Sequence, residues 1–288
     1  MAEAVWEVSD DEATPIRAAA EVVRNASEGP SSWRMVLRVP DWPGFRPGQF
    51  AMLSAGAQQA ARRTDPLLPR PMAVYRADSG GDWSDVEILY KRVGRGTALL
   101  AAALPGQSVT IVGPLGKAFP PPRPGERVTI VAGGTGIASV YELAARLAGA
   151  HPVEVLFGAR TAGDLMAIED FEALKIPLRV ATEDGSAGVR GVVTDLLESA
   201  LDDPTAGADL PGSGRRVYVC GPTAMMRRCA EIASRREVSC IAALETTMAC
   251  GFGVCLGCAT PLQKGGYALV CRDGPAFDAA SIDWERLP

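Results

Sequence analysis

Four cysteines near the carboxyl end of the chain place the strongest constraint on its fold. Cys250, Cys255, Cys258 and Cys271 follow one another with four, two and twelve residues between them. The first three match the C-x4-C-x2-C run that holds a [2Fe-2S] cluster in plant-type ferredoxins, where a fourth cysteine follows at a distance. Glycines between these cysteines let the backbone wrap closely around a small cluster. The spacing therefore predicts a [2Fe-2S] site.

A zinc site and a disulfide framework are the alternatives that this pattern leaves open. Zinc ribbons usually arrange their ligands as two short pairs far apart, whereas three of these thiols lie within residues 250–258 and the fourth ends a strand-like YALVC segment. The remaining cysteines, Cys220, Cys229 and Cys240, lie in apolar or helical surroundings and are expected to be buried thiols.

Length and charge exclude several classes of protein. A chain of 288 residues suggests two or so domains, and a net charge of −5 without a Lys/Arg cluster argues against a nucleic-acid partner. The acidic first 15 residues lack the apolar region of a signal peptide. No apolar run approaches the about 20 residues of a membrane span. We therefore expect a cytoplasmic protein, where thiols stay reduced. The single histidine, His151, is expected in a helix-to-strand loop without a catalytic role.

Residues 1–118 carry the signals of an antiparallel β-barrel or sandwich. Short β-rich runs alternate with Gly/Pro turns at 34–39, 49–54, 71–77, 85–93 and 108–113, and only 97–104 reads as a helix. The Pro-rich stretch at 119–127 then predicts a domain boundary.

From 128 to 236 the pattern changes to repeated strand–helix units. Strands are expected at 128–132, 153–159, 177–182 and 216–221, each followed by a helical stretch. Such repeats predict a doubly wound parallel sheet that binds a nucleotide at the carboxyl ends of its strands. The turns at 133–136 and 220–222 lie at those ends.

The first of these turns contains Gly133, Gly134, Thr135 and Gly136, and its glycines would let a diphosphate approach the next helix. It departs from the G-x-G-x-x-G fingerprint, because Ser139 replaces the third glycine and the second strand ends as FGAR without an acidic residue. A standard Rossmann dehydrogenase is therefore disfavoured. A turn that only tightens the strand–helix connection is the alternative.

Sequence blocks along most of the chain resemble the ferredoxin reductase superfamily. In order they read RPMAVY, YKRVGRGT, GPLGKAF, VAGGTGIAS, TEDGS…GVVTDLL, VCGPTAMM and ETTMACGFGVCLGCA…VCRDGPAF. The last block is most similar to the electron-transfer subunits of class 1B, NAD-linked dihydroorotate dehydrogenases. The resemblance implies three domains: an FAD-binding β-barrel (1–118), an NAD-binding α/β domain (119–236) and a [2Fe-2S] domain (237–288).

The resemblance also assigns residues to the flavin. The family's Arg-Pro-x-Ser motif corresponds to Arg70, Pro71, Met72 and Ala73, so the serine is missing here. The match continues at Leu89, Tyr90 and Lys91, and at Gly96 and Thr97, whose amides would open a helix beside the FAD diphosphate.

Beside the nicotinamide, the family's CGP motif corresponds to Cys220, Gly221 and Pro222, which makes Cys220 the catalytic candidate. A strand end followed by a helix-starting proline is the alternative interpretation. We interpret Glu183 and Asp184 as loop residues, because hydride transfer between flavin and nicotinamide needs no protein acid of that kind.

The implied mechanism follows from the cofactors. A nicotinamide carries a hydride and a [2Fe-2S] cluster carries single electrons, so a flavin must stand between them. The resemblance implies an FMN-containing dihydroorotate dehydrogenase catalytic subunit as partner, in a heterotetramer with two copies of each subunit. NAD and NADP are not distinguished. Rival hypotheses are an NAD(P)H-dependent ferredoxin or sulfhydrogenase subunit of the same superfamily and a structural zinc protein.

The loop between the cluster cysteines carries an unusual set of apolar side chains, Phe252, Val254 and Leu256. Exposed apolar patches commonly mark association sites. We therefore expect this loop to form part of the surface that meets the partner, with packing around the cluster itself as the alternative.

Overall fold

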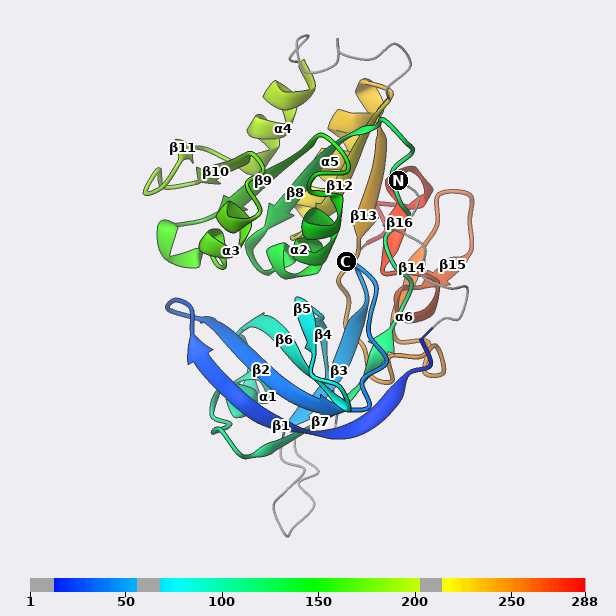
Figure 1. Ribbon diagram of the computed structural model, residues 1–288. Helices are drawn as coiled ribbons and strands as arrows, with labels where there is room; N and C mark the ends of the chain where they lie inside the picture. The colour runs from blue at the N-terminus through cyan, green and yellow to red at the C-terminus, as the bar shows by residue number, and fades with distance from the viewer. Residues whose placement is uncertain (1–12, 56–67, 203–213, 288) are drawn as a thin grey trace.

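The computed structural model describes residues 13–55, 68–202 and 214–287. Figure 1 shows a curled β-sheet in the lower half, a helix-covered parallel sheet in the upper half, and the C-terminal segment along one side of both. The acidic start of the chain, on which the expected absence of a targeting sequence rests, lies almost wholly outside the described residues. None of the helices in the described ranges is long and apolar enough to cross a membrane.

The first sheet contains seven strands, in the order β4-β3-β7-β1-β2-β6-β5, and every pairing within it is antiparallel. The strands are β1 (Ile16–Ser27), β2 (Ser32–Pro40), β3 (Phe50–Ala55), β4 (Arg70–Ala73), β5 (Arg76–Ser79), β6 (Trp83–Lys91) and β7 (Ser108–Leu115). The sequence analysis did not predict β1, because the side chains of this strand that face away from the barrel core are only partly apolar.

The segment expected as a single strand at 71–77 is two strands, β4 and β5, at opposite edges of this sheet. Between them, Val74 donates its amide to the Gln49 carbonyl next to β3 (3.2 Å), and Tyr75 donates to Glu87 on β6 (2.9 Å). The chain thus crosses from one sheet edge to the other, and this crossing curls the sheet toward a barrel. Buried backbone amides need hydrogen-bond partners. Two short strands supply such partners at both edges of the sheet, whereas one strand would supply them at only one edge.

Alternation along β6 shows how the barrel is placed against the rest of the molecule. Val86, Ile88 and Tyr90 are buried in the barrel core, whereas Leu89 between them packs into a core shared with the parallel sheet. Successive side chains of a strand point to opposite faces. The helix α1 (Arg95–Ala101) follows, and the Asn25 side-chain amide donates to the carbonyls of Leu100 (2.8 Å) and Ala101 (3.2 Å) at its end.

The second sheet has the order β11-β10-β9-β8-β12-β13-β16. Its strands are β8 (Arg127–Gly133), β9 (Val153–Ala159), β10 (Leu178–Thr182), β11 (Val189–Arg190), β12 (Arg215–Cys220), β13 (Ser239–Ala243) and β16 (Ala276–Asp278). All neighbours pair in parallel except β13 and β16. The order reverses between β8 and β12, so the sheet is doubly wound as expected.

Helices cover both faces of this sheet. On one face, α2 (Ile137–Leu147) and α3 (Ile168–Ala173) pack with Ile130 of β8. On the other, α4 (Val193–Asp202) and α5 (Thr223–Arg235) pack with Val131. The alternation of β8 side chains therefore separates two cores. The second core also contains Met52 and Leu115 of the barrel and the cluster cysteines Cys258 and Cys271, so it joins all three parts of the chain.

The C-terminal segment contributes to the parallel sheet before and after it forms its own structure. β13 and β16 extend the sheet beyond residue 236, the boundary that the sequence suggested. Between them lie the cysteine loop, the hairpin β14 (Ala259–Pro261) and β15 (Tyr267–Leu269), and the short helix α6 (Val270–Asp273). The cluster segment is therefore an insertion between two sheet strands.

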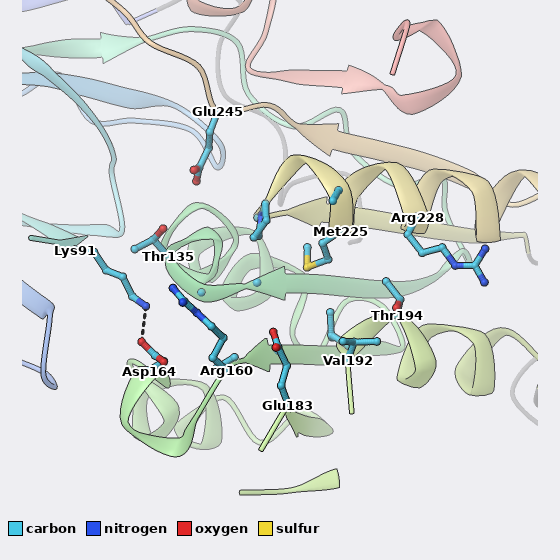
Figure 2. Close-up of a pocket in the computed structure, with 18 residues that line it drawn as sticks. Lys91, Thr135, Arg160, Asp164, Glu183, Val192, Thr194, Met225, Arg228 and Glu245 are labelled. Atoms are coloured by element: carbon cyan, nitrogen blue, oxygen red, sulfur yellow. Dashed lines mark hydrogen bonds and ion pairs between the residues drawn. The ribbon is translucent and has the colours of Figure 1, made fainter. Parts of the chain in front are cut away.

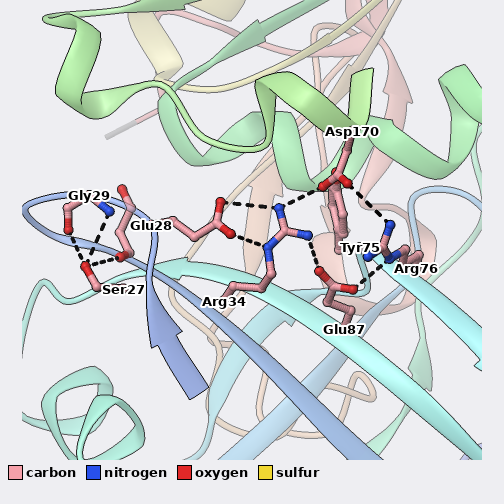
Figure 3. A network of polar contacts seen from close by, with 9 residues as sticks. Ser27, Glu28, Gly29, Arg34, Tyr75, Arg76, Glu87 and Asp170 are labelled. Atoms are coloured by element: carbon pink, nitrogen blue, oxygen red, sulfur yellow. Dashed lines mark hydrogen bonds and ion pairs between the residues drawn. The ribbon is translucent and has the colours of Figure 1, made fainter. Parts of the chain in front are cut away.

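A polar network fixes the parallel sheet above the barrel (Figure 3). Arg34 of β2 forms ion pairs with Glu28, with Glu87 of β6, and with Asp170 of α3 (2.7 Å). Asp170 also accepts a hydrogen bond from the Tyr75 hydroxyl (2.9 Å). Burial of Asp170 opposes ionisation, but the hydrogen bonds from Arg34 and Tyr75 and the charges of Arg34 and Arg76 together outweigh it and lower the pKa of this carboxyl. The network joins residues that the sequence analysis did not single out.

Candidate functional site

The turns after β8 and β12 meet where the order of the parallel sheet reverses. A Cβ added to Gly133 would lie 2.5 Å from the Met225 sulfur and 2.9 Å from Pro222 Cδ, and one added to Gly221 would lie 3.0 Å from Gly133 Cα. Only glycine permits this approach. A cavity of about 560 Å³ opens beside the contact and is lined by Gly133, Gly134, Thr135, Gly221 and Pro222 (Figure 2). This is the position where open α/β sheets bind nucleotides.

Charged side chains of opposite sign lie at different points along this cavity. Arg160, after β9, reaches toward the glycine turn in Figure 2, while Glu183, after β10, lies beside Val192 farther along. At one end Lys91 of the barrel donates to Asp164 at 2.7 Å, which joins the two halves of the molecule. A cation near the glycine turn suits a diphosphate, and a carboxylate suits ribose hydroxyls.

A second cavity of about 510 Å³ lies between the barrel, the parallel sheet and the C-terminal segment. The predicted flavin residues that line it are Arg70, Pro71, Met72, Ala73, Leu89, Tyr90, Lys91 and Thr97. The opposite wall consists of Cys220, the segment from Ala243 to Met248, and Pro275. Residues far apart in sequence thus enclose one space, and its volume falls within the range of small-molecule and cofactor sites.

Arg70 lies against the start of α1. A Cβ added to Gly96 would be 2.5 Å from Arg70 Nε, so Gly96 leaves room for the guanidinium. Thr97 Oγ1 accepts hydrogen bonds from the amides of Val93 (2.9 Å) and Gly94 (3.1 Å) and shapes the loop before the helix. Gly96 itself does not line the cavity. The arrangement places a guanidinium beside the amino-terminal end of α1, a combination suited to a diphosphate.

The two cavities share Lys91, Thr135 and Glu245, so they adjoin at these residues. Glu245 faces this junction, where solvent reaches it through the cavities although protein surrounds it. This enclosure raises the pKa of the Glu245 carboxyl despite a contact from the Cys220 thiol, whose sulfur lies 3.8 Å from Glu245 Oε1. Burial raises the pKa of Cys220 above its ordinary range, and Glu245 adds to the effect. Cys220 therefore stays a thiol.

Gly136 has a packing role that the sequence did not reveal. A Cβ there would lie 2.2 Å from the Cys220 carbonyl oxygen, so the start of α2 must be glycine to sit against the end of β12. Gly136 does not line the nucleotide cavity. The turn thus combines residues that face the cavity with one that holds the turn against the neighbouring strand.

The four cluster cysteines lie in two pairs. Cys258 and Cys271 are buried, with their sulfurs 3.1 Å apart, and Cys250 accepts a hydrogen bond from the Cys255 side chain. Within the described ranges, no three His, Cys, Asp or Glu side chains are arranged to hold a single metal ion. Two pairs fit a binuclear cluster, because each of its irons takes two protein ligands. The donor set therefore fits [2Fe-2S].

The loop around Cys250, the first cluster cysteine, lowers the pKa of its thiol and so favours metal binding. Partial burial of the Cys250 sulfur opposes ionisation, but amides of Cys255, Phe252 and Val254 donate to it and lower its pKa to about 6. The thiolate is the form that binds metal. By contrast, burial and the neighbouring Cys258 raise the pKa of Cys271 to about 12. Iron would have to displace that proton.

The outer side of the loop is apolar and accessible. Phe252, Val254 and Leu256 are 55%, 74% and 62% exposed, and Cys255 between them is also exposed. The alternative that these three side chains pack around the cluster is therefore wrong. Cys220, Cys229 and Cys240 are buried thiols, as expected.

Sequence reasoning missed Arg160, Asp164 and Glu245 and gave Glu183 no cofactor role. The available signal was position: Arg160 and Glu183 directly follow parallel strands, and Glu245 follows the last one. Side chains at the carboxyl ends of such strands commonly face the ligand. His151 lies in the expected helix-to-strand connection, where its Nδ1 contacts the Glu126 carbonyl at 3.2 Å.

Two family models match the chain. Residues 245–283 match the iron–sulfur cluster binding domain of dihydroorotate dehydrogenase B, and residues 130–231 match the oxidoreductase NAD-binding domain. The first match overturns the zinc and disulfide alternatives for the four cysteines. It begins at Glu245, the residue at the junction of the cavities.

Curated relatives extend the similarity to nearly the full length. The dihydroorotate dehydrogenase B (NAD(+)) electron transfer subunit of Desulforamulus reducens is 32% identical over 89% of this chain and 94% of its own. The probable counterpart of Methanopyrus kandleri is 39% identical over 90% and 88%.

Solved structures confirm the fold. An NADH-dependent reduced ferredoxin–NADP oxidoreductase, studied for flavin-based electron bifurcation, superimposes with a TM-score of 0.77 at 26% identity over 94% of this chain and 91% of its own. A ferredoxin reductase of carbazole 1,9a-dioxygenase gives 0.62 at 22% identity over 78% and 67%. The matches identify FAD, an iron–sulfur cluster and NAD as the cofactors. The chain belongs to the family of dihydroorotate dehydrogenase B electron transfer subunits.

Proposed function

We propose that this protein carries electrons from the FMN of a dihydroorotate dehydrogenase catalytic subunit, through its [2Fe-2S] cluster and FAD, to NAD+ in pyrimidine biosynthesis. One observation carries the proposal. The nucleotide and flavin cavities adjoin at Lys91, Thr135 and Glu245, and the wall of the flavin cavity runs directly into the cysteine loop. This adjacency supports an order of NAD, FAD and cluster along the chain's three parts.

The flavin site is proposed to use the barrel side of the second cavity. Arg70 and the amides of Gly96 and Thr97 would hold the FAD diphosphate, and Tyr90 and Leu89 would lie along the ring system. When bound, FAD supplies the exchange between a hydride and single electrons. Ala73 provides no hydroxyl to the flavin, so the polar contacts at that point must come from backbone groups.

The nucleotide site is proposed to use the first cavity. Gly133, Gly134 and Arg160 would hold the NAD diphosphate, and Glu183 would accept hydrogen bonds from the adenosine ribose. The nicotinamide would then reach the junction beside Cys220, Gly221 and Pro222, where Glu245 and the Cys220 thiol form the floor. Because the Cys220 thiol is neutral, it can contact the ring without placing a negative charge beside it.

The cluster site is proposed to use Cys250 and Cys255 on one iron and Cys258 and Cys271 on the other. We further propose the division into 1–118, 119–236 and 237–288 as cofactor-binding units, with β13 and β16 of the last unit completing the sheet of the second. A heterotetramer of two copies of each subunit and a cytoplasmic location complete the proposal. Seven free cysteines support a reducing compartment.

The partner surface is proposed to be the apolar side of the cluster loop, defined by Phe252, Val254 and Leu256. Single-electron transfer requires the cluster to lie near the donor flavin, so the loop that wraps it must be thinly covered. Exposed apolar side chains on such a loop gain stability when a partner covers them.

Leu256→Asp and Phe252→Asp test this surface, with Leu104→Asp as a matched control. Leu104 lies on the barrel and is 62% exposed, the same fraction as Leu256. The variants should bind the catalytic subunit more weakly in size-exclusion chromatography, whereas the control should form the complex normally. NADH-driven dye reduction, which needs only FAD and NAD, should be unchanged in all three. Normal complexes in both loop variants would remove this loop from the interface, and a wild-type protein that binds no such subunit would overturn the proposed function.

A further inference from the structure

The cluster loop has a second, inward side that contacts the barrel. Gly251 is buried and has φ +88°, and a Cβ at this position would lie 2.6 Å from Met52 Cγ and 3.0 Å from Leu115 Cδ1. Met52 of β3 and Leu115, the last residue of β7, are 1% and 4% exposed. A larger residue at 251 would fit only if the loop or the Met52 side chain moved.

The two barrel residues that contact Gly251 stand beside the flavin cavity. Met52 pairs across the sheet with Pro71, and Leu115 pairs with Phe50. Both Pro71 and Phe50 line the flavin cavity. The contact therefore joins the cluster loop to strands that form the flavin wall, and the separation between the two sites depends on how closely Gly251 approaches.

The chain itself connects the two sites by a short path. Residues 244–248 line the flavin cavity, and Cys250 follows Met248 with one residue between them. Met248 is 6% exposed and lies in the same core as Met52, Leu115, Cys258 and Cys271. A second contact between the barrel and the C-terminal segment lies nearby, where the Lys117 amide donates a hydrogen bond to the Gly274 carbonyl at 2.6 Å. The cluster segment is thus held on the barrel at two points, once through its loop at Gly251 and once after α6 at Gly274.

We propose that Gly251 is a positioning residue that sets the flavin-to-cluster distance, and through it the rate of single-electron transfer between the two cofactors. The proposal rests on the electron order given above. Tunnelling between cofactors weakens exponentially with their separation, so a small outward shift of the loop reduces the rate without removing either cofactor. An alanine at 251 forces such a shift, because tightly packed cores accommodate an added methyl group only by displacing atoms.

A positive φ alone also disfavours alanine, and Gly265 separates the two effects. Gly265 lies in the same segment with φ +86°, but a Cβ there meets no atom within 4 Å. Gly265→Ala therefore carries the same backbone strain without the contact. Gly251→Ala and Gly265→Ala share the positive φ, but only Gly251 is buried against the barrel and next to a cluster cysteine, whereas Gly265 is exposed.

The test uses the full-length protein reconstituted with FAD and cluster, without the partner. After mixing with NADH in a stopped-flow instrument, both variants should bleach FAD at the wild-type rate, and only Gly251→Ala should reduce the cluster several-fold more slowly. Independently of the cofactors, hydrogen exchange of β3 and β7 amides should rise in Gly251→Ala alone. If cluster reduction in Gly251→Ala matches the wild type, or Gly265→Ala slows it equally, the proposal is overturned. Absence of cluster reduction in the wild type would instead contradict the proposed electron order.

A suppressor covers the case in which Gly251→Ala fails to hold its cluster. Met52→Ala removes the Cγ and sulfur atoms that the added methyl would meet. The double variant should regain iron, cluster EPR signal and a faster cluster reduction than Gly251→Ala. If Met52→Ala restores none of these, contact with the barrel is not the reason for glycine at 251.

Discussion

The junction of the two cavities and the cluster loop differ in secondary structure and in the kind of side chain that they present. The junction is formed by residues at or just beyond the ends of strands, including Lys91 at the end of β6, Thr135 after β8 and Glu245 after β13. The cluster loop at 249–258 has no helix or strand, and three of its apolar side chains are more than half exposed. Hydride transfer needs two cofactors held face to face away from water, whereas single-electron transfer needs only a short distance to a partner. In the proposed function, the junction serves hydride transfer and the cluster loop serves single-electron transfer.

The largest expected effect is the loss of the cluster without loss of flavin or nucleotide binding. Replacing Cys250, Cys255, Cys258 or Cys271 with serine should abolish the cluster, because each single variant leaves one of the two irons a thiolate ligand short, while FAD and nucleotide binding remain. NADH should still bleach the flavin. Iron analysis, the visible spectrum and anaerobic NADH titration measure these outcomes.

Cys229→Ala is the control for the cysteine variants, since it removes a buried thiol outside the loop. It should keep a full complement of iron. A folded Cys250→Ser protein whose flavin no longer responds to NADH would show that the cluster lies between NAD and FAD, and the proposed order would then be wrong.

A charge reversal within the nucleotide cavity comes next in size. Glu183→Arg should raise the preference for NADPH over NADH by about tenfold or more, equivalent to about 1.4 kcal/mol, because the carboxylate repels a 2′-phosphate that arginine would bind. The ratio of kcat/KM for the two nucleotides in dye reduction measures it. Glu172→Arg makes the same charge change on an exposed position of α3 outside the cavity and should leave the ratio alone. Equal ratios in both variants would exclude Glu183 from the ribose site.

The network that holds the two sheets together should respond to pH in a predictable direction. Asp170 has a lowered pKa in the folded protein, so its contribution to stability is present above the ordinary pKa of about 3.9 and is lost as the pH falls through the folded value. Asp170→Asn should reduce the free energy of unfolding by about 1–3 kcal/mol at pH 7 because it weakens the bonds from Arg34 and Tyr75.

Urea unfolding of wild type and Asp170→Asn between pH 7 and pH 3 measures this difference, which should shrink toward the acid end. Asp202→Asn breaks an ion pair with Arg236 at an exposed site and should change stability less. A loss in Asp170→Asn that stays constant down to pH 3 would contradict an electrostatic origin.

The smallest expected effect restores a group that the family carries. Ala73→Ser adds a hydroxyl to the flavin cavity and should tighten FAD binding by about 0.5–1.5 kcal/mol, the usual net value of one hydrogen bond. Fluorescence titration of the deflavinated protein gives the dissociation constant. Ala77→Ser, on β5 outside the cavity, is the control and should leave it unchanged. Weaker binding in Ala73→Ser would mean that the cavity has no room for a hydroxyl.

The sequence by itself determined those parts of the protein that depend on short spacings. Three cluster ligands lie within nine residues, so their identity follows from local reach, and the strand–helix alternation from 128 to 236 predicted the doubly wound sheet because side-chain periodicity is local. The family motifs likewise pointed to residues that the structure brings together along the second cavity, which is the proposed flavin site. These features can be predicted without knowing which distant residues are in contact.

Only the tertiary structure decided which distant residues meet. Asp170 reaches Arg34 across 136 positions, Glu245 approaches Cys220 from the segment after β13, and Gly251 touches Met52 on the barrel. No periodicity encodes such pairs, because their separation depends on how sheets and loops stack once the chain has folded. The same reason explains why 71–77 read as one strand: its split between two sheet edges is a property of the closed sheet, since the backbone partners on each edge come from elsewhere in the chain.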